Sequence, residues 1–341
     1  MGSRLTGMPP DSLPFPPMEA ELVRELPAGG GWAYEPKWDG FRGVLENLDG
    51  ELALWSRNGR PLLRYFPELR PLGERLPDRS ALDGEVVIVR DGALDFDAMQ
   101  MRLHPADSRI RRLSAELPAS YVVFDLLVWR GEPVWQRTLE ERRAELERVA
   151  RGFRLSPSTS DVAEARGWLD RFEALGLDGV VAKRLGVAYL PGSRDGVVKV
   201  KEHRTADCVV VGVRWKGSRE EIATLLLGLY RDDGELDYVG SCAVAAKSRS
   251  EVAEKLLPLV EEDPEWRASE PNRWGSGGLE ESRVRAELVV EVRYDKVQGN
   301  RFRHGTKLIR WRPDKDARDC SWRELQPAGV ATGESVEKLM V

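Results

Sequence analysis

Residues 35–43 read EPKWDGFRG and place one lysine, Lys37, between an acid, a turn and an arginine. The segments on either side have the pattern of strands, and Asp39-Gly40 between them is typical of a hairpin turn. A lysine that attacks a substrate needs its neutral amine, which nearby cations and burial both favour. Arg42 supplies such a cation. The same residues also fit a solvated lysine in a turn, so the rest of the chain decides between the two interpretations.

Strand and helix patterns continue outward from this stretch. The apolar run Val86–Val89 and the segment 121–129 (YVVFDLLVW) are typical of strands buried in a sheet. Apolar residues at helical spacing predict helices that pack on such sheets. The pattern indicates an α+β domain with antiparallel sheets and flanking helices. Other strands are predicted at 32–36, 41–46, 51–56, 80–90, 180–184 and 197–201, and helices at 19–26, 65–76, 96–103, 138–150 and 161–175.

Near residue 205 the pattern changes to short, regularly spaced strands. A small domain of this kind with one helix is typical of a β-barrel. The strands are predicted near 208–215, 223–230, 236–245, 287–294 and 306–312, and the helix from Ser250 to about Val260. We therefore predict a proline-rich arm at residues 1–18, a first domain at 19–204 and a barrel domain at 205–341.

The composition argues against several classes of protein. A formal net charge of −5 over 341 residues disfavours a generally basic nucleic-acid coat, so such contacts would come from local stripes. The three cysteines, Cys208, Cys242 and Cys320, lie far apart and predict neither a disulfide framework nor a zinc site. The N-terminal residues lack the apolar run of a signal peptide or membrane helix. We expect a cytoplasmic protein that does not enter a membrane.

A basic stripe runs through the last part of the barrel domain. About ten cations are interleaved there with aromatic residues against roughly four acids, a composition found in surfaces that bind phosphate groups. The alternative is an exposed strand face along which arginine side chains lie. The cations are Arg293, Lys296, Arg301, Arg303, Lys307, Arg310, Arg312, Lys315, Arg318 and Arg323.

The first domain combines acids and amines that suit phosphoryl chemistry. Asp39, Glu85 and Asp178 lie at predicted strand ends, where carboxylates can hold a hydrated Mg²⁺. Lys199 and Lys201 alternate along one strand and leave the same face. Such amines neutralise charge on a transferred phosphoryl group, and a lysine nucleophile would form a covalent phosphoramidate. The sequence contains no Walker A loop, so a nucleotide would be held differently.

The order of these segments resembles the motif series of the covalent nucleotidyltransferases. The series spans nearly the whole chain beyond the proline-rich arm. The residues between the motifs, including 298–304 (QGNRFRH), resemble the small bacterial ATP-dependent DNA ligases of the C type. The segments that carry the resemblance are Lys37–Arg42 (KWDGFR), Arg57–Gly59 (RNG), Asp83–Glu85 (DGE), Val123–Asp125 (VFD), Asp178–Lys183 (DGVVAK), Val198–Lys201 (VKVK) and Arg310–Lys315 (RWRPDK).

The resemblance implies a nucleotidyltransferase domain of the ATP-grasp-like ligase type, followed by an OB-fold barrel. It also implies three chemical steps. Lys37 attacks the α-phosphate of ATP and becomes lysyl-AMP, AMP passes to the 5′-phosphate of a nick in duplex DNA, and the 3′-hydroxyl then displaces AMP. The implied cofactors are ATP and Mg²⁺ or Mn²⁺, the implied partner is nicked duplex DNA, and we expect a monomer that acts in DNA repair or end joining.

The resemblance also implies roles for individual residues. Glu35 would contact the adenine edge, and Phe124 would stack on its face. Arg42 would contact phosphate or ribose, Glu85 would meet the ribose or support the metal, and Asp178 would lie near the metal. The family more often has glutamate at this last position, so that contact would run through water. The remaining roles are catalytic for Lys37, Asp39, Arg42, Lys199 and Lys201, and nucleotide-binding for Arg57, Lys183, Lys199, Lys201, Arg312 and Lys315, of which the last two would orient pyrophosphate.

Other interpretations stay open at this point. An RNA ligase or a capping guanylyltransferase shares the lysine and the two-domain plan, and a preference for ATP or GTP separates the capping enzyme. A non-catalytic nucleic-acid-binding barrel protein belongs to a different class, and the intact Lys37, Glu85, Lys199 and Lys201 argue against it. NAD-dependent ligases are disfavoured, because the sequence lacks the cysteines of their zinc module.

Overall fold

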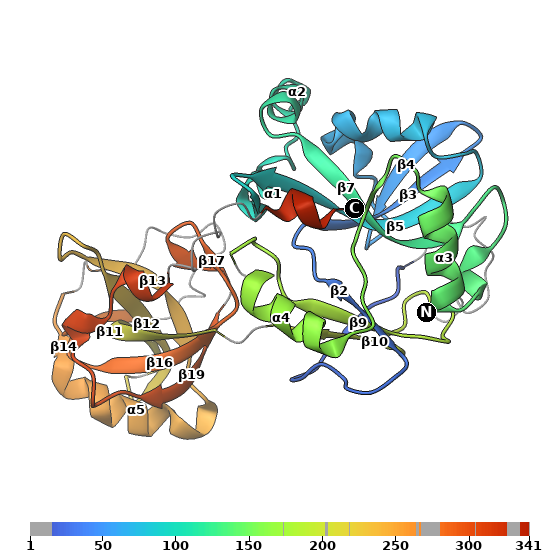
Figure 1. Ribbon diagram of the computed structural model, residues 1–341. Coiled ribbons are helices and arrows are strands. Elements are labelled where there is room, and N and C mark those ends of the chain that lie inside the picture. The colour runs from blue at the N-terminus through green and yellow to red at the C-terminus, as the bar shows by residue number, and fades with distance from the viewer. Residues whose placement is uncertain are drawn as a thin grey trace. The chain divides into compact units, whose positions relative to one another are not determined.

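The computed structural model describes residues 16–172, 174–201, 204–217, 219–263, 266, 280–303, 305–325 and 335–340. The chain divides into two compact units, one of residues 1–202 with 328–341 and one of residues 203–327 (Figure 1). No helix in the described part of the chain is long and apolar enough to cross a membrane.

The larger sheet of the first unit is built from β3 (Phe41–Leu48), β4 (Glu51–Ser56), β5 (Ser80–Arg90), β6 (Ala93–Leu94), β7 (Ala119–Val128) and β8 (Arg154–Leu155). Its order is β4-β3-β5-β7-β8, and β6 pairs with β5 outside this path. Neighbouring residues of β5 enter different cores: Val86 packs with Leu45 on one face, and Val87 packs with Val180 on the other. Because both faces are buried over part of their length, β5 and β7 contain continuous apolar runs, Val86–Val89 and Tyr121–Phe124.

The smaller sheet of this unit is built from β1 (Glu21–Leu22), β2 (Trp32–Pro36), β9 (Val180–Arg184) and β10 (Val197–Val200). Its order is β1-β10-β9-β2, with β1 and β10 parallel and the other two pairs antiparallel. Ala182 and Val200 of this sheet share a core with Val87 and Val122 of the larger sheet. The two sheets therefore pack against each other.

The α-helices described in this unit are α1 (Phe96–Met101), α2 (Asp107–Glu116), α3 (Leu139–Val149) and α4 (Val162–Phe172). α1, α3 and α4 contact the sheets, whereas α2 contacts the 3₁₀ helix Pro67–Glu74. α3 begins with a capping box, in which the side chains of Thr138 and Glu141 each accept a hydrogen bond from the other residue's N–H. It packs on β7, while α4 packs on β2 and β9 and buries Ala165 and Trp168.

Two segments predicted as helices differ in the structure. Residues 19–26 contain β1, because backbone pairing of Glu21 and Leu22 with β10 at the sheet edge replaces a helix. Residues 65–76 lie mainly in 3₁₀ helices, Leu63–Tyr65 and Pro67–Glu74. Pro67 and Pro71 lack the N–H that an α-helix would use, which favours the tighter and shorter turns.

The C-terminal residues 335–340 pack in the first unit. The N–H of Val336 donates to the carbonyl of Gly92 at 2.8 Å, and Val336 and Met340 are buried in the core that contains α4, β2 and β9. The predicted barrel range of 205–341 was therefore too long, because these apolar side chains find their partners in the first unit. Of the predicted arm, residues 1–15 lie outside the described residues, and Met18 is buried.

The second unit is a closed barrel. Its strands are β11 (Arg204–Lys216), β12 (Glu221–Tyr230), β13 (Leu236–Ala243), β14 (Val260–Glu261), β15 (Glu281–Val284), β16 (Val289–Tyr294) and β19 (Thr306–Trp311). They follow the order β12-β13-β19-β16-β11-β15-β14, and a further pairing of β12 with β11 closes the sheet on itself. α5 (Arg249–Leu256) packs on β12. The predicted barrel is thus confirmed.

Candidate active site

Lys37 lies where the chain passes from one sheet of the first unit to the other. It follows β2 of the smaller sheet and precedes β3 of the larger sheet, so the prediction that Asp39-Gly40 is the tip of a hairpin was wrong. The N–H of Lys37 donates to Gly179 O at 2.8 Å, and the N–H of Asp178 donates to Lys37 O at 2.9 Å. Gly40 is required at the crossing, because a Cβ there would lie 2.0 Å from the carbonyl oxygen of Val86.

The amine of Lys37 lies in a cluster of charged groups. Its Nζ is 2.5 Å from Asp178 Oδ2, and Lys201 Nζ is 2.9 Å from the same oxygen. Burial raises the pKa of Asp178, but the two amines lower it by more, so this pKa lies below its ordinary value. Burial and the charges of Lys37 and Lys201 lower the pKa of Lys199. The fold therefore brings these four predicted site residues together.

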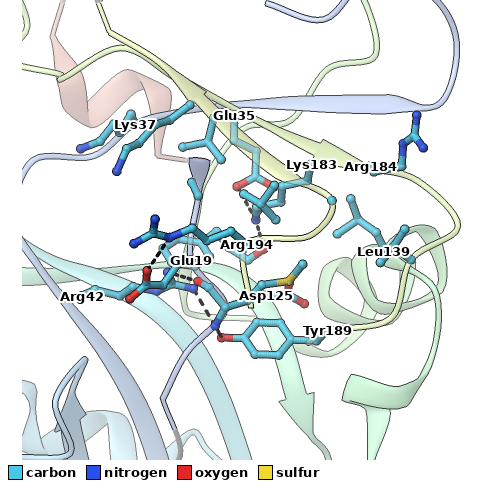
Figure 2. Close-up of a pocket in the computed structure, with 18 of the residues that line it drawn as sticks. Glu19, Glu35, Lys37, Arg42, Asp125, Leu139, Lys183, Arg184, Tyr189 and Arg194 are labelled. Carbon is cyan, nitrogen blue, oxygen red and sulfur yellow. Dashed lines mark hydrogen bonds and ion pairs between the residues drawn. The ribbon is translucent and has the colours of Figure 1, made fainter. Parts of the chain in front are cut away.

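A cavity of about 390 Å³ is lined from both sheets of the first unit (Figure 2). Its volume is in the range of small-ligand sites. Of the described site residues in the first unit, Asp39, Asp178 and Lys201 are not part of its lining, and Asp39 is buried with 7% exposure. The predicted site residues that do line it are Glu35, Lys37, Arg42, Arg57, Glu85, Phe124, Lys183 and Lys199.

Glu35 and Lys183 form a buried ion pair in this cavity. Lys183 Nζ donates to both oxygens of Glu35 at 2.9 Å and to the carbonyl of Phe124 at 3.3 Å. The same nitrogen lies 4.7 Å from the centre of the Phe124 ring. Burial raises the pKa of Glu35, and Lys183 acts in the opposite direction. An acid, an amine and an aromatic ring are thus held together at one place.

Arg42 is held by a carboxylate and by the N-terminal segment. Asp83 is fully buried and accepts from Arg42 Nε at 3.1 Å and from Nη2 at 2.7 Å. Arg42 Nη1 donates to the carbonyl of Met18, and its guanidinium carbon lies 5.4 Å from the Phe124 ring centre. Burial lowers the pKa of Arg42, but the neighbouring Asp83, Tyr189 and Glu85 together raise it above its ordinary value, so the guanidinium stays charged.

Glu85 lines the cavity close to the crossing. Its Oε1 accepts from the N–H of Gly40 at 3.2 Å. Burial raises the pKa of Glu85 to about 8, against the opposing charges of Lys37 and Arg42. A carboxyl that is costly to ionise in this way is one whose charged form a bound cation would stabilise.

Replacing Glu85 with glutamine is expected to change how stability depends on pH. The folded-state pKa of about 8 lies above the ordinary 4.5, so the folded protein binds more protons between these values and loses stability as the pH rises through them. Glu85→Gln lacks this titration. Relative to the wild type, its melting temperature should rise between about pH 5 and about pH 8. Melting temperatures that change in parallel would contradict the prediction.

In the second unit, Arg312 and Lys315 converge on Asp207. Arg312 Nη1 is 2.6 Å and Lys315 Nζ is 3.1 Å from Asp207 Oδ2. Arg312 also donates to Asp314, from Nε to Oδ1 at 2.9 Å and from Nη2 to Oδ2 at 2.9 Å. Hydrogen bonds from Arg312 lower the pKa of Asp314 to about 2. The two predicted pyrophosphate-binding cations therefore lie side by side.

Three residues of these networks were not among the predicted site residues. Asp83 belongs to the DGE segment that sequence analysis singled out, but it was given no role there. Asp207 and Tyr189 carry no local signal, because their hydrogen-bond partners Arg312 and Asp83 lie 105 and 106 residues away. Only the tertiary structure identifies them.

Comparison with known families shows which family has this sequence. Residues 17–201 match the ATP dependent DNA ligase domain, and residues 218–315 match the ATP dependent DNA ligase C terminal region. The chain belongs to the ATP-dependent DNA ligases. The predicted family, enzyme class and use of ATP are confirmed by this match.

Relatives of this DNA ligase cover nearly all of its length. DNA ligase C2 of Mycolicibacterium smegmatis is 43% identical over 336 residues, which are 92% of this chain and 94% of the relative. DNA ligase C of Mycobacterium tuberculosis is 41% identical over 363 residues, 98% and 99% of the two chains. The multifunctional non-homologous end joining protein LigD of Pseudomonas aeruginosa is 35% identical over 324 residues, 92% of this chain and 37% of that protein.

The fold of this DNA ligase is also shared with solved structures. A Lig E DNA ligase superposes with a TM-score of 0.53 at 16% identity, over 86% of this chain and all of that one. The first unit of the ligase is accordingly a nucleotidyltransferase domain and the second an OB fold, which confirms the predicted fold class.

Proposed function

We propose that this DNA ligase seals nicks in duplex DNA through a covalent lysyl-AMP formed on Lys37. The observation that carries the proposal is that Lys37 lines a cavity together with Glu35, Phe124 and Lys199, while Asp178 contacts its amine. In the first step the amine nitrogen attacks the α-phosphorus of ATP, a P–N bond forms and the bond to pyrophosphate breaks. AMP then passes to the 5′-phosphate of the nick, and the 3′-hydroxyl displaces it.

In this proposal the adenine lies against Phe124. The ring lines the cavity, and the adjacent Glu35 would contact the edge of the base. Lys183 is bound to both oxygens of Glu35, which supports a role in orienting this acid. A direct contact of Lys183 with the nucleotide, as the resemblance implies, would require the amine to leave that pair.

The phosphates of ATP would lie near the remaining cations of the first unit. Lys199 and Arg57 line the cavity beside Lys37, and Lys201 shares Asp178 with it. These cations would neutralise charge that develops on the transferred phosphoryl group. From the OB fold, Arg312 and Lys315 would orient the pyrophosphate. We assign Asp39 a supporting catalytic role, since it is buried at the crossing that positions Lys37.

We also propose that Glu85 and Asp178 hold a divalent cation, Mg²⁺ or Mn²⁺. The described residues contain no group of three potential metal ligands. Two carboxylates fit such an ion when phosphate oxygens of the substrate and water complete its shell. The pKa of Glu85, about 8, supports this role, because a bound cation would stabilise the ionised carboxylate. When bound, the ion would neutralise phosphate charge, and Asp178 would reach it through water while it still contacts the lysines.

DNA repair or end joining is the process that we propose for this ligase, on the basis of its relative LigD. We further propose a monomer that acts in the cytoplasm. The family match supports this function over the RNA ligase and the GTP-dependent capping enzyme, and nucleotide preference and the sealing of an all-RNA nick test the difference.

Intact mass measured with and without ATP tests the proposed function. Incubation with ATP and Mg²⁺ should add the mass of one AMP, and pyrophosphate should remove it. GTP should add nothing, and the adenylylated protein should seal a nick in DNA in preference to one in RNA. A protein that gains no mass from ATP, or that gains GMP instead, would overturn the proposal.

A further inference from the structure

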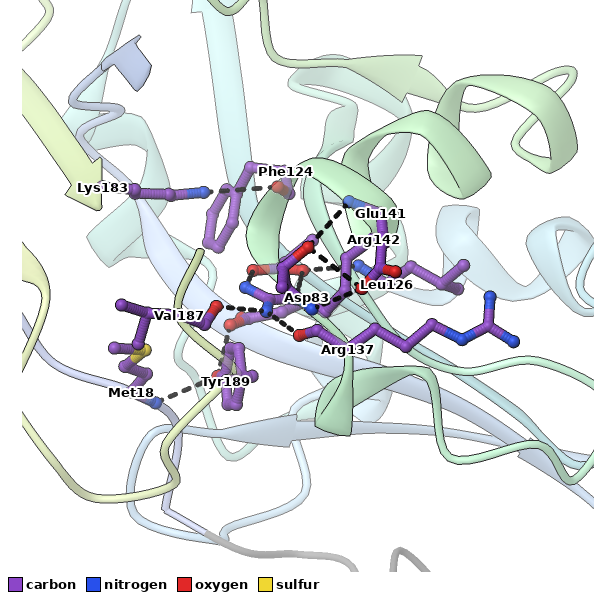
Figure 3. A network of polar contacts seen from close by, with 12 residues as sticks. Met18, Asp83, Phe124, Leu126, Arg137, Glu141, Arg142, Lys183, Val187 and Tyr189 are labelled. Atoms are coloured by element: carbon purple, nitrogen blue, oxygen red, sulfur yellow. Dashed lines mark hydrogen bonds and ion pairs between the residues drawn. The ribbon is translucent and has the colours of Figure 1, made fainter. Parts of the chain in front are cut away.

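Tyr189 lies outside the motif segments, yet its hydroxyl contacts Met18, Asp83 and Arg42 at the cavity. It is 1% exposed and lines the cavity. Its hydroxyl accepts from the N–H of Met18 at 3.0 Å and donates to Asp83 Oδ2 at 2.6 Å (Figure 3). Arg42 Nη2 lies 3.4 Å from the same hydroxyl. One oxygen thus links the N-terminal segment to the ion pair that holds Arg42.

The N-terminal segment 18–22 forms part of the cavity wall. Met18, Glu19, Ala20 and Leu22 all line the cavity. The backbone of Met18 is fixed at both its polar groups, because its carbonyl accepts from Arg42 and its N–H donates to Tyr189. Further along, the N–H of Glu19 donates to the carbonyl of Ser193 at 2.7 Å, and β1 pairs with β10. The segment is therefore held on the strand that carries Lys199.

Asp83 connects Tyr189 to Arg42. The aspartate is fully buried, and its Oδ2 accepts from both Arg42 Nη2 and the Tyr189 hydroxyl. Burial and the charge of Asp83 raise the pKa of Tyr189 well above its ordinary value, so the hydroxyl keeps the proton that it donates. Without this hydroxyl, a buried carboxylate would lose a donor and the buried Met18 N–H would lose its acceptor. Both losses weaken the hold on Arg42 and on the segment.

The Tyr189 ring is itself held in place. The guanidinium carbon of Arg142 lies 5.7 Å from the ring centre, and Arg142 forms a buried ion pair with Asp125 at 2.8 Å. Arg142 Nη1 also donates to the carbonyl of Val187 at 3.1 Å, two residues before Tyr189. The hydroxyl is thus presented from a fixed position, as a group that orients others must be.

We propose that Tyr189 is a positioning residue of the adenylylation step, whose hydroxyl holds Arg42 and residues 18–22 in place as a wall of the ATP site. This inference rests on the proposed function, because it takes the cavity as the ATP site. Tyr189 acts through Arg42 and Met18 and does not touch the reacting atoms. Its loss should therefore weaken nucleotide binding more than the chemical step.

Tyr189→Phe tests the inference, with Tyr34→Phe as the matched control. Tyr34 is also 1% exposed and its hydroxyl donates to the carbonyl of Pro27 at 2.7 Å, but it does not line the cavity. In single-turnover adenylylation, Tyr189→Phe should raise the ATP concentration that gives half the maximal rate (the KM for ATP in this assay) by about tenfold, the effect of one lost buried hydrogen bond. The maximal rate of AMP transfer to Lys37 should change by less than about threefold. Tyr34→Phe should leave the KM unchanged. An unchanged KM in Tyr189→Phe, or an equal rise in both variants, would overturn the inference.

Amide hydrogen exchange on the wild-type protein gives a second measurement that does not depend on the folding of a variant. An ATP analogue with a methylene group between the α- and β-phosphorus atoms cannot transfer AMP, so it reports binding alone. Its binding should slow exchange in residues 18–22 by about tenfold. Unchanged exchange there would contradict the role of this segment. If the wild type adenylylates Lys37 but these two measurements are negative, only this inference fails and the proposed function stands.

Discussion

Lys37→Ala is expected to abolish formation of the ligase–AMP intermediate. In the structure the amine of Lys37 is the group at the junction of the cavity and the Asp178–Lys201 pair, and the crossing between the two sheets fixes its backbone. Alanine removes the nitrogen to which AMP would be attached. The rate of AMP transfer from ATP should fall by at least about four orders of magnitude, as for the loss of other enzymatic nucleophiles. Intact mass and radiolabel transfer from ATP measure the loss.

A nick that already carries AMP on its 5′-phosphate provides the control for this variant. The last step uses the 3′-hydroxyl as nucleophile, so Lys37→Ala should still seal such a nick. Its melting temperature should stay close to that of the wild type, because the side chain lies in a solvent-accessible cavity and is 21% exposed. A variant that still accepts AMP from ATP would refute the assignment of the nucleophile.

Arg312→Ala is expected to impair adenylylation by about a hundredfold, the usual effect of removing one donor that stabilises developing charge. The guanidinium is held by Asp207 and Asp314, so it is oriented before any ligand binds. If it orients pyrophosphate, it acts only in the step that releases pyrophosphate. Sealing of a pre-adenylylated nick should therefore change by less than about threefold. The two rates are measured side by side on the same preparation.

Arg310→Ala is the matched control for this second variant. Arg310 lies on β19, two residues before Arg312, and its Nε donates to Glu291 at 2.6 Å. It removes the same charge from the same region but not from the Asp207 cluster. We expect near wild-type adenylylation from Arg310→Ala. Equal losses of Arg312→Ala in adenylylation and in sealing would refute a specific role in the first step.

Much of the fold could be predicted from the sequence because the central strands have strong patterns. β5 and β7 contain apolar runs that are buried on both faces, and the barrel strands are short and regularly spaced. The hairpin prediction at Asp39-Gly40 failed for a physical reason. Turn signals report local geometry, whereas the partner of β2 is β9, which is more than a hundred residues away and pairs Glu35 with Val181. A local pattern cannot show such a partner.

Part of the candidate site could likewise be predicted from the sequence, and part could not. The side chains that the resemblance implied mostly line one cavity, although their roles remain predictions. The groups that hold them were not predictable, since Asp83, Tyr189 and Asp207 are defined by pairing with residues far along the chain. Charge pattern and periodicity contain no information on such pairs. The tertiary fold is needed to show which acid neutralises which cation.

The packing of Val336 and Met340 in the nucleotidyltransferase domain has a consequence for biosynthesis. Val336 is fully buried in a core in which every other member, apart from Leu339 and Met340 beside it, precedes the barrel in the sequence. A ribosome therefore releases the complete barrel before the last side chains of the first core emerge. The nucleotidyltransferase domain can complete its own core only after the barrel has been synthesised, so the barrel is the part of this ligase that can finish folding first.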